Sequence, residues 1–231
     1  MQIVLTMGVI LLSYLIGSIP FGLVIVRLST GKDIRAVESG RTGGTNAMRA
    51  AGFWAGLATA LLDLLKGTST VWLARALLPG EVWVTVLAPV AAVLGHNYSI
   101  FLMERDQAGK IRLRGGAGGA PTVGGAMGLW FPSLFIILPL GVLILYLIGY
   151  ASLATLSVAF TATLIFAYRA WIGASPWQYV VYGLFTQAIL ILALLPNIRR
   201  LLTGTERLVG LRAKLRNKPA HAAKEHRRTN N

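Results

Sequence analysis

A short polar loop between two long apolar runs carries the residue types that bind phosphate in proteins. Residues 38–49 read Glu-Ser-Gly-Arg-Thr-Gly-Gly-Thr-Asn-Ala-Met-Arg. Glycines let backbone N–H groups approach an anion closely, and the arginine fork matches the oxygens of a phosphate. In a binding role, the backbone and Arg49 would hold the phosphate while Ser39 and Asn46 hydrogen-bond to it. In a structural role, the loop would only form turns, and its arginines would only fix the membrane topology.

Two opposite charges lie inside the second apolar run. Asp63 and Lys66 are three residues apart, which places them on the same face of a helix. An unpaired charge in a bilayer is costly, so we expect the two side chains to pair with each other or to line a polar cavity. They could form a structural pair that neutralises itself, or either one could organise a site through arginine or backbone partners.

Polar side chains also follow the third and the last apolar runs. His96-Asn97-Tyr98-Ser99 ends the third run, and Asn197 precedes Arg199 and Arg200 at the end of the last one. A lone histidine is usually structural, but His96 could donate a hydrogen bond to an anion or accept a proton. The two arginines could be membrane-edge anchors, whereas Asn197 could add a hydrogen bond to a ligand.

A second glycine-rich segment, Arg114-Gly115-Gly116-Ala117-Gly118-Gly119, precedes the fourth apolar run. With Lys110 and Arg112 close by, it could form a second anion-binding nest. Alternatively, the pairs Gly115/Gly119 and Gly124/Gly128 could serve helix packing, because small residues four apart let helices approach closely. The segment is neither a P-loop nor a dinucleotide-binding motif, since no Gly-Lys-Ser/Thr follows and no strand is predicted before it.

The apolar runs determine the predicted fold. The chain has 231 residues, of which 55% are hydrophobic, and a mean hydropathy of +0.65. Runs of about 20 apolar residues span a bilayer core, and these runs lack the polar face that a soluble helix needs. They cover residues 3–26, 53–78, 82–103, 120–167 and 179–195. We therefore predict an all-α, polytopic integral membrane helical bundle over residues 1–206, followed by a basic cytoplasmic tail at residues 207–231.

The placement of basic residues predicts the orientation. The net charge is +14, and basic side chains are concentrated after the first run, after the third run and in the tail. By the positive-inside rule, the amino terminus lies outside, the carboxyl terminus is cytoplasmic, and parity favours about seven transmembrane helices. The polar clusters then share the cytoplasmic end, which favours one common site.

The tail at residues 207–231 is explained as a topology signal with attraction to anionic lipid, worth about 1 kcal/mol per basic residue near the surface. Nucleic-acid binding is not expected, because aromatic residues do not alternate with the basic ones. The absence of cysteine excludes disulfides and thiolate metal sites.

Taken together, these segments resemble the acyl-phosphate-dependent glycerol-3-phosphate acyltransferases of bacteria, the PlsY family, over most of the chain. The matching segments are 13–22, Asp33-Ile34-Arg35, Ser39-Gly40, Gly43-Gly44-Thr45-Asn46 with Arg49, 62–67, 95–99, Gly115-Gly116, Ser152-Leu153, and 197–202 with Gly204-Thr205-Glu206. In combination these motifs are highly specific for the family.

The resemblance implies a multi-pass inner-membrane enzyme of phospholipid synthesis with its active site at the cytoplasmic face. Such an enzyme transfers a fatty acyl group from acyl phosphate to the sn-1 hydroxyl of glycerol 3-phosphate, giving lysophosphatidic acid and phosphate. The implied partners are the two substrates and membrane lipids; no cofactor, metal or obligate protein partner is implied.

The resemblance also implies roles for individual residues. Catalytic roles are implied for Ser39, His96 and Asn197. Substrate-binding roles are implied for Gly43, Gly44, Thr45, Asn46, Arg49, Asp63, Lys66, Gly115, Gly116 and Ser152. Arg114 is a further binding candidate from the possible anion nest described above. The phosphate of the donor can take the proton of the acceptor hydroxyl itself, and His96 is the candidate base if the protein supplies one.

The chain departs from the family pattern at several positions. Glu38 stands where the family usually has glycine, and Arg41 and Thr42 stand where it has asparagine and isoleucine. Ala117 replaces a lysine and Leu194 replaces a histidine, both of which handle phosphate in the family. The lost charge could come from another backbone position, with Arg41, Arg112 and Arg114 as the candidates.

These departures keep two other functions open. One is a diverged homologue that binds anionic lipid or lipid precursors without catalysis. The other is a small transporter for an organic phosphate, which the glycine-interrupted helices and the charges within the second run would suit.

Overall fold

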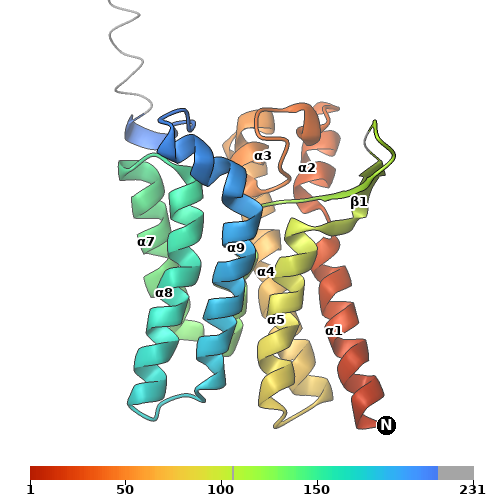
Figure 1. Cartoon of the computed structure of the whole chain (residues 1–231), viewed down its shortest axis with the longest axis vertical. Helices are drawn as coiled ribbons and strands as arrows, with labels where there is room; N and C mark the ends of the chain where they lie inside the picture. Colours follow the sequence, from red (N-terminus) through yellow and green to blue (C-terminus); the bar gives the residue numbers. More distant parts are fainter. Residues whose placement is uncertain (106, 213–231) are drawn as a thin grey trace, which may run out of the picture.

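Apolar segments in a bilayer must satisfy their own backbone hydrogen bonds, and they do so by forming helices. Helices accordingly dominate the computed structural model (Figure 1). The structure describes residues 1–105 and 107–212. The α-helices are α1 (Gln2–Ser18), α2 (Phe21–Thr30), α3 (Gly44–Ala51), α4 (Phe53–Leu77), α5 (Val82–Asn97), α6 (Gly119–Leu129), α7 (Leu134–Leu147), α8 (Ala151–Trp171) and α9 (Gln178–Leu202). Two short 3₁₀-helices, η1 (Ile34–Ala36) and η2 (Phe131–Ser133), connect them. The predicted helical bundle is thus confirmed.

Several of these helices have the length and composition of membrane spans. Within the described part of the chain, the segments Gln2–Thr30, Ala151–Trp171 and Gln178–Leu202 are long and apolar enough to cross a bilayer, and Val82–Asn97 and Phe131–Leu147 are shorter apolar segments. The division of the chain at residue 206 stays a prediction, because residues 213–231 of the tail lie outside the described residues.

A break divides the first apolar run into α1 and α2. Pro20 follows Ile19, and the residue before a proline is disfavoured in the helical conformation, so α1 ends at Ser18 and α2 begins at Phe21. The break leaves backbone carbonyl oxygens of this segment without helical partners, and those of Gly17 and Ile19 accept hydrogen bonds from Lys66 of α4.

A β-hairpin follows α5 and departs from the prediction of an all-α chain. Strands β1 (Ser99–Arg105) and β2 (Ile111–Arg114) pair antiparallel, with a register irregularity between Ser99 and Met103. The predicted run at residues 82–103 therefore ends as a helix at Asn97. The Ser99 hydroxyl donates to the backbone oxygen of Ser18, which anchors the start of the hairpin beside the break in the first span.

Small residues allow α4 and α6 to pack closely. A Cβ on Gly124 would overlap the backbone carbonyl of Leu64, and a Cβ on Gly67 would overlap that of Pro121. Gly128 faces Val71 one turn further along. The predicted Gly124/Gly128 pair is thus a packing pair, as small residues at membrane helix crossings usually are.

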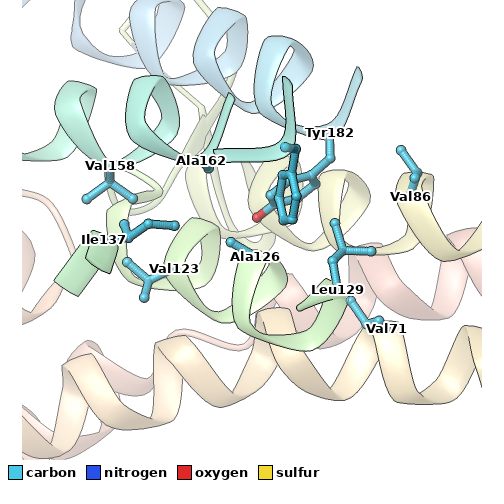
Figure 2. Packing of buried hydrophobic residues seen from close by; sticks show 10 residues of the cluster. Val71, Val86, Val123, Ala126, Leu129, Ile137, Val158, Ala162 and Tyr182 are labelled. Atoms are coloured by element: carbon cyan, nitrogen blue, oxygen red, sulfur yellow. The ribbon is translucent and has the colours of Figure 1, made fainter. Parts of the chain in front are cut away.

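The largest apolar core lies among α4 to α9, around Tyr182 (Figure 2). The Tyr182 hydroxyl donates to the backbone oxygen of Thr122 at 2.6 Å, which satisfies the one polar atom of this buried ring. The residues packed with it are Val71, Val86, Val123, Ala126, Leu129, Ile137, Val158, Ala162 and Phe166. This core fixes α6 and α9 against α4, and these helices carry the site described next.

Candidate active site

Most of the predicted site residues line one cavity of about 340 Å³. The cavity is at the end of the bundle where α3 lies and where α9 ends (Figure 1). The predicted residues along its wall are Ser39, Gly43, Gly44, Thr45, Asn46, Arg49, Asp63, His96, Ser152 and Asn197. The expectation of one common site is therefore supported by the geometry, although the segments come from across the whole chain.

Asn46 positions the loop that precedes it. Its side-chain nitrogen Nδ2 donates to the backbone oxygens of Ile34, Val37 and Arg41 at 3.2, 3.0 and 2.8 Å. The side chain is buried, and its Oδ1 has no hydrogen-bond partner among the described residues. Asn46 therefore shapes the wall of the cavity by holding residues 34–41 in place, and its amide nitrogen is not free to contact a ligand.

The first turn of α3 presents backbone donors to the cavity. The helix begins at Gly44, so the N–H groups of Gly44 and Thr45 have no acceptor within the helix. Arg49 lies further along the same short helix and lines the same cavity. No Asp or Glu of the described residues forms an ion pair with Arg49. Helix-end donors and a guanidinium without a carboxylate partner in the same cavity suit an anion.

Asp63, Lys66 and His96 form a buried cluster. Asp63 Oδ1 lies 2.9 Å from Lys66 Nζ, and both side chains are 2% exposed, so the predicted pairing is confirmed. The same oxygen lies 3.6 Å from His96 Nδ1. This separation is too long for a hydrogen bond, so the carboxylate lies beside the imidazole without bonding to it.

Gly115 and Gly116 make room for the end of α5. The Gly116 N–H donates to the backbone oxygen of His96 at 2.8 Å. A Cβ on Gly116 would overlap His96 Nε2, and a Cβ on Gly115 would overlap the His96 backbone oxygen. The imidazole edge that carries Nε2 is therefore held beside Gly116, and these glycines act through close packing against His96.

A second network joins α8, α9 and the segment after α9 through Glu206. The Glu206 carboxylate accepts hydrogen bonds from Asn197 Nδ2 at 2.9 Å, from Arg200 Nε at 2.9 Å and from the Ser152 hydroxyl at 3.4 Å. Glu206 itself is buried and lines the cavity. Glu206 was not among the predicted site residues, and it connects two residues that were, Asn197 and Ser152.

Arg41 joins this network through Asn197. Its guanidinium donates to the backbone oxygen of Gly116 at 2.8 Å, to that of Ala193, and to Asn197 Oδ1 at 3.3 Å. Its own backbone N–H donates to the Ser39 hydroxyl oxygen at 3.4 Å. Arg41 was named from the sequence as a possible source of charge but not as a site residue; the structure places it at the cavity wall.

Two predicted binding residues lie at a different place. Arg114 and Gly115 line a second, more open cavity of about 350 Å³, which shares Ser39, Arg41, Asn197 and Arg200 with the first. Arg114 forms an ion pair with Glu104 across the hairpin. The structure therefore places Arg114 outside the cavity in which most of the predicted residues meet.

Comparison with known proteins decides the family. A family model described as glycerol-3-phosphate acyltransferase matches residues 7–204. The chain belongs to the glycerol-3-phosphate acyltransferase family. This membership confirms the resemblance drawn from the sequence motifs.

Individual relatives agree with the family model over almost the whole chain. Glycerol-3-phosphate acyltransferase 2 of Moorella thermoacetica is 35% identical over 204 residues, which cover 88% of this chain and 97% of the relative. The glycerol-3-phosphate acyltransferase of Rubrobacter xylanophilus is 37% identical over 205 residues, covering 88% and 95%.

Solved structures of the family share the fold. A crystal structure of PlsY, an integral membrane glycerol 3-phosphate acyltransferase, in its glycerol 3-phosphate form matches with a TM-score of 0.76 and 31% identity, covering 91% of this chain and 98% of that one. The lysophosphatidic acid form matches with a TM-score of 0.73 and 29% identity, covering 89% and 95%. The apolar helices described above are accordingly those of an integral membrane protein of this family.

Proposed function

We propose that this protein transfers a fatty acyl group from acyl phosphate to the sn-1 hydroxyl of glycerol 3-phosphate, releasing lysophosphatidic acid and inorganic phosphate. The observation that carries the proposal is the meeting, in one cavity, of Arg49 without a carboxylate partner, the first turn of α3 and the His96 imidazole. Family membership supports the reaction type, since the matching relatives are named as glycerol-3-phosphate acyltransferases.

The chemistry needs positioning more than activation. Acyl phosphate is a mixed anhydride, so its acyl carbon is already reactive and no covalent enzyme intermediate is required. The sn-1 oxygen attacks that carbon and forms the ester bond, while the bond from the carbon to the phosphate oxygen breaks and phosphate leaves with the electron pair. Holding two anionic substrates in register, and stabilising the charge that develops, are the tasks of the cavity.

The proton of the hydroxyl has two available acceptors. One is the departing phosphate, and the other is a ring nitrogen of His96, which lines the cavity. The His96→Ala variant separates these routes. A fall in kcat of about 100-fold or more assigns the proton to His96, whereas a smaller fall assigns it to the phosphate.

We further propose how the protein sits in the membrane. We assign one crossing each to the segments α1–α2, α4, α5, α6, α7, α8 and α9, although α5, α6 and α7 have only 16, 11 and 14 residues and are shorter than a full span of about 20. Basic residues such as Arg27, Lys32 and Arg207 gather at the cavity end, which the positive-inside rule places in the cytoplasm. The amino terminus is then on the side of the membrane away from the cytoplasm, and the protein resides in the inner membrane.

The decisive assay uses detergent-purified protein with palmitoyl phosphate and glycerol 3-phosphate. The expected result is phosphate release that requires glycerol 3-phosphate, with lysophosphatidic acid detected by mass spectrometry. Binding of glycerol 3-phosphate without phosphate release would instead indicate a non-catalytic homologue. Uptake of glycerol 3-phosphate into proteoliposomes without acyl transfer would indicate a transporter.

A further inference from the structure

Arg41 is a half-buried cation whose hydrogen-bond partners do not neutralise it. Two of its acceptors are backbone oxygens, of Gly116 and Ala193, and the third is the neutral amide of Asn197. No Asp or Glu of the described residues forms an ion pair with it. Burial lowers the pKa of Arg41 from its ordinary value, but an arginine side chain stays protonated in proteins.

Most of the other cations around the cavity form ion pairs with carboxylates. Lys66 pairs with Asp63, Arg200 with Glu206, and Arg207 with Glu38. Within the described residues, Arg41 and Arg49 are the arginines of the cavity wall without such a partner. The proposed reaction brings two phosphate groups into this cavity, and the wall therefore offers one uncompensated guanidinium for each.

The contacts of Arg41 also place it beside two substituted positions. Its guanidinium binds the backbone oxygens of Gly116 and Ala193, which directly precede Ala117 and Leu194. Ala117 and Leu194 both line the same cavity as Arg41, and neither can carry a charge. The guanidinium thus lies against the backbone directly before both positions.

The geometry points to Arg41 as a phosphate-binding residue that supplies, from the loop before α3, the positive charge missing at positions 117 and 194. This inference rests on the proposed function for the identity of the ligand: a phosphate group carried by glycerol 3-phosphate or by the acyl phosphate. The backbone carbonyls hold the guanidinium in place, and its remaining N–H groups and its charge are left for the phosphate.

The test compares Arg41→Ala with a matched control, Arg75→Ala. Arg75 lies near the carboxyl end of α4, away from the cavity, and likewise donates to two backbone oxygens, of Gly128 and Leu129, and to one neutral side chain, Tyr179. Losing a charge-assisted contact with a phosphate should raise the KM for one substrate roughly 10- to 150-fold in Arg41→Ala. Arg75→Ala, measured below its melting temperature, should keep both KM values.

Measuring the KM of each substrate at saturating levels of the other identifies which phosphate Arg41 holds. A second variant, Arg41→Ala with Ala117→Lys, returns a cation to the cavity and should recover at least part of the lost affinity. Arg41→Ala with unchanged kinetic constants would overturn the inference. A double variant whose KM is as high as that of Arg41→Ala would also overturn it. A lysine at position 117 can replace a lost charge but cannot replace a purely structural contact with α9.

The wild-type protein distinguishes a failure of the proposed function from a failure of the inference about Arg41. If it releases no phosphate, the reaction is wrong, and Arg41 is then tested by isothermal titration calorimetry with glycerol 3-phosphate and with palmitoyl phosphate. Weaker binding of either probe by Arg41→Ala but not by Arg75→Ala still supports the inference. Equal binding of both probes by all three proteins overturns it.

Discussion

At the scale of single residues, the basic side chains of the cavity wall form two groups: those in an ion pair with a carboxylate and those without such a partner. Arg49, in the last turn of α3, belongs to the second group and lines the same cavity as Gly44 and Thr45 of the first turn. We expect Arg49→Ala to lower kcat/KM about 10- to 150-fold, which corresponds to about 1.5–3 kcal/mol for a lost charge-assisted hydrogen bond. Steady-state kinetics with palmitoyl phosphate and glycerol 3-phosphate measure the change.

The control for this variant is Arg27→Ala. Arg27 is an exposed arginine of α2 that does not line the cavity, so its removal tests whether any loss of positive charge near this end lowers activity. Wild-type turnover by Arg49→Ala, or an equal loss in Arg27→Ala, would argue against a specific phosphate contact at Arg49.

Glu38 is a strained residue at the rim of the cavity. Among the described residues it is the non-glycine residue with positive φ, at 47°, and its exposed carboxylate pairs with Arg207. An L-residue in this conformation costs about 1–2 kcal/mol, whereas an exposed ion pair contributes about 0–1 kcal/mol. We therefore expect Glu38→Gly to have a higher melting temperature than Glu38→Ala, which loses the ion pair but keeps the strain. Equal melting temperatures in detergent would show that the strain is absent.

Some of this residue-scale chemistry could be predicted from the sequence and some could not. The Asp63–Lys66 pair follows from a spacing of three residues on one helix. The contacts of Arg41 with Gly116 and Ala193 join positions that are far apart in the chain, and no local pattern reports them. The same is true of Glu206, whose only signal in the sequence was the Gly204-Thr205-Glu206 motif.

At the scale of elements, the site depends on how closely α4 and α6 pack. Gly124 lies against the backbone of Leu64, next to Asp63, so a methyl group at position 124 pushes the two helices apart. We expect Gly124→Ala to lower the free energy of unfolding by about 1–3 kcal/mol, as overpacking usually does. Unfolding in mixed detergent micelles, followed by tryptophan fluorescence, measures the loss.

Gly8→Ala is the matched control for this substitution. Gly8 is in the middle of α1, and a Cβ there would meet no atom within 4 Å. It should leave stability unchanged or raise it slightly, because alanine favours the helix. If Gly124→Ala were as stable as Gly8→Ala, the close α4–α6 crossing would not contribute to the fold as described.

Element boundaries show the limit of the apolar pattern. The runs located the helices, but the run at residues 82–103 continues past the end of α5 into β1. Ser99 marks the change, because its buried hydroxyl bonds to the backbone of Ser18, a contact that depends on where the first span breaks. Hydropathy alone does not distinguish an apolar strand at the membrane surface from the last turn of a helix.

At the scale of the whole molecule, one orientation accounts for both the charges and the site. Within residues 1–105 and 107–212, most of the basic residues outside the helices lie on the segments at the cavity end, and the opposite end holds the short connections from α4 to α5 and from α8 to α9. Both substrates of the proposed reaction are anionic, and a positive rim raises their local concentration. The topology signal and the substrate-binding surface are then the same set of side chains.

Cysteine labelling tests this orientation directly, because the chain contains no cysteine of its own. Lys32 is exposed after α2 at the cavity end, and Ala174 is exposed between α8 and α9 at the other end. We expect a membrane-impermeant maleimide to label Ala174→Cys in intact cells and Lys32→Cys only after the membrane is permeabilised. Labelling of both after permeabilisation confirms that each cysteine is reachable. Labelling of both in intact cells, or the reverse order, would contradict the orientation, and the cavity would then open away from the cytoplasm.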